Sequence, residues 1–77
     1  MKKESELECY LYFMWNDFCD YYCNKIFGEK EGRILYNIYL SCCDRCHHEG
    51  AAATFYQELT ENEREKLVQF AVKYYND

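Results

Sequence analysis

The sequence predicts an all-α protein, a small bundle of three or four helices in which a long N-terminal helix is central. The 77-residue chain contains no proline and only three glycines, which removes the usual turn residues of β-sandwiches and barrels. Its apolar side chains recur at helical spacings of three and four residues. With 49% apolar and 30% charged residues it has the composition of a globular domain. We expect one domain over residues 1–77.

The first helix is expected over residues 5–27. Ser5 and Glu8 have the spacing of a capping box, in which the hydroxyl and the carboxylate satisfy unpaired backbone amides. Two adjacent apolar stripes follow, one made of Leu7, Leu11, Met14, Phe18 and Tyr22, and the other of Tyr12, Trp15, Cys19, Cys23 and Ile26. This periodicity predicts a helix with a wide apolar face.

The N-terminal half of this helix carries apolar residues on its remaining side as well. Tyr10 and Phe13 lie there, ahead of Asp17. A helix that is apolar nearly all round is either central in the fold or presents its far side to a partner. Because a chain of this length has a small interior, we expect a partner-binding surface made of Tyr10, Phe13, Trp15 and Asp17.

Three further segments complete the predicted bundle. A turn over residues 28–32 precedes a helix over residues 33–46, for which a strand is the alternative because of its Ile, Leu and Tyr residues. A short helix is expected over residues 51–59. The last helix begins after Thr60, which forms a second capping box with Glu63.

The cysteines are the only residues whose spacing indicates chemistry. Cys19 and Cys23 are four residues apart, as are Cys42 and Cys46, so each pair shares a helix face. On two antiparallel helices the four sulfurs form either a zinc site or two disulfides. That convergence requires a turn centred just after Gly32, whereas the expected turn is centred on residue 30. Buried thiols that act as small apolar side chains are the third interpretation.

Charge and motif content exclude several classes of function. The 14 acidic residues outnumber the nine basic ones, giving a net charge of −5, which argues against nucleic-acid binding. Cys43 and Cys46 lie close to His47 and His48 in sequence, but adjacent residues on a helix do not face each other, so no catalytic dyad is indicated. The longest apolar run is too short to cross a membrane and no secretory signal is recognisable, which predicts a cytoplasmic protein.

The sequence therefore predicts an acidic, non-enzymatic protein–protein interaction module of accessory or inhibitory type, without a cofactor. It would present an aromatic helix face to a protein partner or to a second copy of itself. Two alternatives remain open, and both use Cys19, Cys23, Cys42 and Cys46. One is a zinc-stabilised helical domain and the other is a disulfide-locked helical hairpin.

Overall fold

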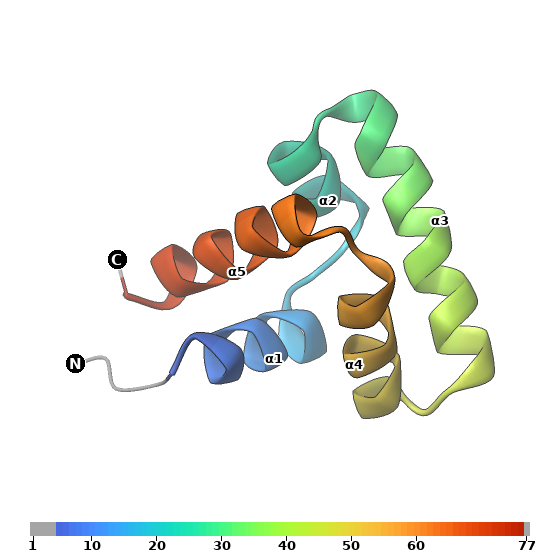
Figure 1. The fold of residues 1–77 in the computed structure, drawn as a ribbon, viewed down its shortest axis with the longest axis horizontal. Coiled ribbons are helices and arrows are strands. Elements are labelled where there is room, and N and C mark those ends of the chain that lie inside the picture. The colour runs from blue at the N-terminus through green and yellow to red at the C-terminus, as the bar shows by residue number, and fades with distance from the viewer. Residues whose placement is uncertain (1–4, 77) are drawn as a thin grey trace.

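The computed structural model describes residues 5–76, and this part of the chain is helical with no strands. The described residues form five helices (Figure 1): α1 (Glu6–Asn16), α2 (Asp20–Phe27), α3 (Glu29–Arg45), α4 (His48–Glu58) and α5 (Glu61–Asn76). The all-α class is confirmed, whereas the expected count of three or four helices is wrong. None of the described helices is both long enough and apolar enough to cross a membrane.

The long N-terminal helix expected over residues 5–27 is broken into α1 and α2. The backbone amides of Asp17 and Phe18 both donate to the carbonyl of Phe13, at 2.8 and 2.9 Å, which ends α1. Cys19 is then extended, with φ −157° and ψ 178°, and caps the start of α2. The physical reason is the ring of Phe18, which packs against Tyr39 with ring centroids 5.0 Å apart. Leaving the helix places this ring among the core aromatics.

The expected turn over residues 28–32 is reduced to a single residue. Gly28 has φ +94°, a left-handed conformation that glycine adopts without steric cost. Gly32 lies inside the first turns of α3 and is buried. The helix expected from residue 33 therefore starts at Glu29, and the strand alternative for this segment is wrong. The two helices α2 and α3 join at Gly28 and pack against each other (Figure 1).

The core lies where α1, α4 and α5 meet, with α3 closing it beside α4 (Figure 1). Its largest fully buried side chains are Tyr10, Phe13, Phe55, Met14 and Leu67. Ala51 and Ala52 are fully buried too, and small side chains let α1 approach the α4 backbone closely. The hydroxyl of Tyr10 donates to the carbonyl of Ala52, which satisfies a polar group that would otherwise be buried alone.

Both predicted capping boxes are present. The amide of Glu8 donates to the Ser5 hydroxyl at 3.2 Å, and the amide of Ser5 donates to the Glu8 carboxylate at 3.1 Å. Thr60 and Glu63 form the same reciprocal pair at 2.9 and 3.2 Å. The helix starts at residues 6 and 61 are therefore fixed by local sequence.

The close crossing of α2 and α3 yields a first prediction, on Gly32→Ala. A Cβ atom at residue 32 would lie 2.9 Å from the Cα of Asn24 and 3.0 Å from the carbonyl oxygen of Cys23. Backbone atoms cannot rotate away, so the two helices must move apart. We expect the substitution to lower the free energy of unfolding by about 2 kcal/mol, measured by urea denaturation.

Gly50→Ala is the matched control, because the added Cβ would meet its nearest atom, the Cβ of Cys46, at an ordinary 3.5 Å. Gly50 lies inside α4, where alanine is the better helix former. The control should raise stability by up to about 1 kcal/mol. Equal effects of the two substitutions would contradict a close helix crossing at Gly32.

Candidate functional site

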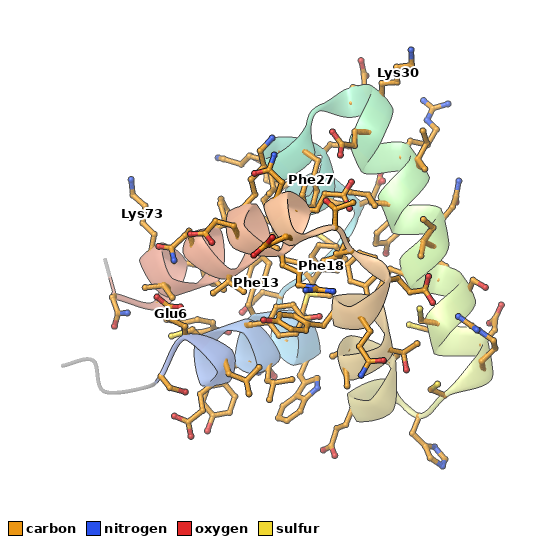
Figure 2. All side chains as sticks on the ribbon, viewed as in Figure 1. Glu6, Phe13, Phe18, Phe27, Lys30 and Lys73 are labelled. Atoms are coloured by element: carbon orange, nitrogen blue, oxygen red, sulfur yellow. The ribbon has the colours of Figure 1, made fainter. Side chains whose placement is uncertain are left out.

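Tyr10 and Phe13 lie in the core, so the expectation that they form an exposed surface is wrong. Both side chains are 0% exposed, and Figure 2 shows Phe13 directed into the interior. The Phe13 ring lies 5.5 Å from that of Phe70 and 5.2 Å from that of Tyr74, both in α5. The helix was correctly predicted to be apolar all round, but α4 and α5 cover the side that was expected to be free.

Asp17 joins the end of α1 to the end of α5. Its carboxylate accepts a hydrogen bond of 2.8 Å from the hydroxyl of Tyr75. Burial, together with this carboxylate, raises the pKa of the Tyr75 hydroxyl, so the hydroxyl remains a proton donor at neutral pH. The structure thus gives Asp17 a contact within the chain that fixes the connection between α1 and α2.

Trp15 projects from the side of α1 away from Phe13, but it packs against the edge of the core and its indole nitrogen is buried. At 100° per residue, Leu11 and Trp15 are each about 160° around the helix from Phe13. Both are half-buried, whereas Leu7 is 54% and Tyr12 41% exposed. We call these four side chains, Leu7, Leu11, Tyr12 and Trp15, the α1 outer face. Of the four, only Trp15 was predicted to bind a partner.

The side chains of this face form a continuous strip. Leu7, Leu11 and Trp15 follow a spacing of four residues, and the ring of Tyr12 makes an edge contact with Trp15 at a centroid distance of 6.2 Å. Cys9, Tyr10, Phe13 and Met14 fill the opposite, buried side of α1. The helix thus has one side buried in the core and a second apolar side, on which Leu7 and Tyr12 are exposed and Leu11 and Trp15 pack against the edge of the core.

A groove between α2 and α5 is the second candidate surface. It has a volume of about 350 Å³ and is lined by Tyr22, Lys25, Phe70, Lys73 and Tyr74. We call it the α2–α5 groove. The ring of Tyr22 lies 5.8 Å from Phe70 and 5.6 Å from Tyr74. Sequence reasoning missed this groove because its two walls are far apart in the chain.

The four paired cysteines do not come together. Because the α2–α3 turn is at Gly28, Cys23 is level with the start of α3, and its thiol donates to the carbonyl of Gly32 at 3.2 Å. Cys42 lies about 15 Å further along α3 than Gly32, at 1.5 Å per residue. Cys46 contacts Thr54 of α4 instead, at 3.6 Å between Sγ and Oγ1.

This arrangement does not bring together the four sulfurs that both cysteine alternatives use. No group of three or more His, Cys, Asp or Glu side chains suited to a metal ion occurs among the residues that the structure describes. No disulfide joins the six cysteines, all of which belong to the described residues 5–76. The early turn at Gly28 is the reason, because it sets Cys19 and Cys23 too near the start of α3.

The thiols of Cys23 and Cys42 are poor nucleophiles in this fold. Burial raises the pKa of Cys23 to about 12, and burial also raises the pKa of Cys42. The reactive form of cysteine is the thiolate, which is scarce at neutral pH in both. His47 is exposed at the start of α4, and the side chain of His48 lies outside the described part of the structure.

We therefore predict two classes of thiol reactivity. Cys19, Cys43 and Cys46 are partly exposed, whereas Cys9, Cys23 and Cys42 are at most 1% exposed. Under native conditions at neutral pH, iodoacetamide should alkylate the first three, and the second three should react only when the protein unfolds. Mass spectrometry of proteolytic fragments over time measures this.

The same experiment under denaturing conditions tests the disulfide alternative. Without a reductant, all six cysteines should then be alkylated. A shortfall of two or four labels would establish disulfides, and rapid native labelling of Cys23 or Cys42 would contradict the buried positions. Native mass spectrometry with and without a chelator checks the zinc alternative, and we expect the same mass in both.

Comparison of the chain with protein-family models, with curated proteins and with solved structures finds no match.

Proposed function

We propose that this protein is a non-enzymatic protein–protein interaction module that binds its partner through the α1 outer face. The observation that carries the proposal is the 54% exposure of Leu7 and the 41% exposure of Tyr12 on the side of α1 opposite the core. Exposed leucine or tyrosine is ordinary when it is isolated. Here both adjoin the half-buried Leu11 and Trp15 in one strip, and aromatic residues are enriched where proteins bind one another.

The size of the α1 outer face suits a single helix of a partner. A stable interface between two globular proteins takes about 20–30 residues a side, whereas this strip contains four apolar side chains along about two helical turns. Residues four apart on one helix face form the ridges that pack into the grooves of another helix. We therefore assign an amphipathic helix as the occupant.

The charge of the chain favours a basic helix. Glu8 lies within the strip and is exposed, and the whole chain carries a net charge of −5. A second copy would bring the same negative charge to the interface, whereas lysine or arginine beside the apolar stripe of a partner helix would meet Glu8 favourably. We propose a partner helix of this kind in preference to a homodimer.

The non-enzymatic part of the proposal is supported by the thiols. Cysteine is the residue type in this chain with the strongest intrinsic nucleophilicity. The burial of Cys23 and Cys42 disfavours their thiolates, and the described part of the chain has no metal-binding cluster that would activate water. Exposed apolar side chains, in contrast, are what a binding surface requires.

The test uses Trp15, the single tryptophan of the chain, as a fluorescent reporter within the proposed interface. The probe is a synthetic helical peptide without tryptophan, with leucine at heptad positions a and d and lysine at e and g. We expect it to shift the emission of Trp15 in a saturable way. A peptide with glutamate at e and g should bind much more weakly.

Leu7→Ser is the test variant and Ile34→Ser the matched control, because Leu7 is 54% and Ile34 55% exposed and they lie on different helices. Leu7→Ser should weaken binding of the lysine peptide about tenfold, near 1.4 kcal/mol, through the loss of apolar contact. Ile34→Ser should leave it unchanged. Circular dichroism checks that both variants are folded.

Three outcomes would overturn the proposal. The first is the absence of any Trp15 response to the lysine peptide, and the second is an equal loss of binding in both variants. The third is a dimer of the protein alone in sedimentation at micromolar concentration that Leu7→Ser dissociates, because the α1 outer face would then belong to a second copy.

A further inference from the structure

The α2–α5 groove concentrates positive charge and aromatic rings in a chain that is otherwise acidic. Lys25 and Lys73 are two of its five lining residues, and the other three are Tyr22, Phe70 and Tyr74. The chain as a whole has 14 acidic and nine basic residues. Among the residues that the structure describes, no acidic side chain lines the groove, so its charge is opposite to that of the chain as a whole.

The rings are arranged as the floor of a site that takes an apolar side chain. Phe70 and Tyr74 are stacked on one side, with 22° between their planes and 6.2 Å between centroids, and Tyr22 faces them from α2. All three are half-buried or exposed. The volume of about 350 Å³ is at the small end of ligand sites and matches one large side chain with its neighbours.

The lysines come one from each wall, since Lys25 belongs to α2 and Lys73 to α5. The ammonium of Lys25 lies 5.7 Å above the ring of Tyr21, a cation–π contact that restrains this side chain beside the groove. Figure 2 shows Lys73 extending outward from α5. Each of the two walls thus contributes one lysine side chain to the lining of the groove.

We propose that the α2–α5 groove binds an acidic segment of another protein, in which an apolar or aromatic side chain is flanked by carboxylates. The apolar side chain contacts Tyr22, Phe70 and Tyr74, and the carboxylates pair with Lys25 and Lys73. This surface is separate from the α1 outer face, and its ligand has the opposite charge to the basic helix proposed there.

Asp17 lies at this end of the molecule, close to Tyr74 and Tyr75. It accepts the hydrogen bond of 2.8 Å from the Tyr75 hydroxyl, and it is not among the groove residues. The Asp17 carboxylate is therefore hydrogen-bonded within the chain.

The experiment titrates the 15N-labelled protein with the capped peptide Glu-Glu-Phe-Glu-Glu and follows backbone amide shifts by NMR. We expect saturable shifts in α2 and α5 centred on the groove, with α1 unaffected. Two further peptides separate the contributions of charge and of the aromatic ring to binding. Lys-Lys-Phe-Lys-Lys keeps the ring and reverses the charge, whereas Glu-Glu-Ala-Glu-Glu keeps the charge and lacks the ring. Both should bind about fivefold more weakly or not at all.

Charge reversal makes the test specific. Lys73→Glu should weaken binding of Glu-Glu-Phe-Glu-Glu about fivefold and strengthen binding of Lys-Lys-Phe-Lys-Lys. The control is Lys30→Glu, at an exposed lysine near the start of α3, and it should change the binding of neither peptide. A merely structural effect of residue 73 would not exchange the two preferences.

Three results would overturn the proposal: equal binding of Glu-Glu-Phe-Glu-Glu and Lys-Lys-Phe-Lys-Lys, amide shifts confined to helices other than α2 and α5, or no saturable shifts at millimolar peptide. Shifts confined to α1 would assign acidic peptides to the α1 outer face and would also contradict its proposed preference for a basic helix. Failure of the groove alone leaves the Trp15 experiment unaffected, so the two proposals fail separately.

Discussion

The position of the Phe18 ring is the constraint from which most of this fold follows. The ring contacts Phe13 of α1, Tyr36 and Tyr39 of α3, and Phe55 of α4, with centroid distances between 5.0 and 6.0 Å. These contacts hold three helices together through one side chain that belongs to none of them. Phe18 reaches this position because the chain leaves helical conformation at Asp17 and resumes it after Cys19. The break sends α2 back along α3 and brings it beside α5, where Tyr22 meets Phe70 and Tyr74.

Helix starts were predictable where the signal was local, and the helix break was not. Ser5 with Glu8 and Thr60 with Glu63 determine their helix ends through bonds within four residues, so the pattern in the sequence is sufficient. The segment around Phe18 has no glycine or proline, and its apolar spacing continues through the break. The cost of ending α1 there is offset by contacts with α3 and α4, which no local pattern contains. Gly32 was expected in a turn, but it lies in α3, where its lack of a side chain allows α2 to approach closely.

The candidate surfaces, too, were predictable from the sequence only in part. The sequence correctly indicated more apolar side chains on the first helix than one buried side requires, but it could not indicate which side would be covered. That choice depends on Ala51 and Ala52, whose small side chains let α4 approach Tyr10, and on α5, whose Phe70 and Tyr74 cover Phe13. Once those contacts form, Leu7 and Tyr12 remain exposed, with Leu11 and Trp15 half-buried beside them. The α2–α5 groove could not be predicted from the sequence, because its walls come from two helices whose adjacency follows from the break at Phe18.

The two surfaces share α5 as their support, which lies between α1 and α2 (Figure 1). Phe70 and Tyr74 contribute to the core and to the groove at once, since each contacts Phe13 on one side and Tyr22 on the other. A small domain buries a smaller fraction of its surface than a large one, so ring faces that finish its core also remain partly in solvent. Among the described residues, two of the places where such faces lie together are the α1 outer face, which contains Glu8, and the groove flanked by Lys25 and Lys73. Apolar contact supplies attraction at both, and the opposite charges supply the discrimination between their ligands.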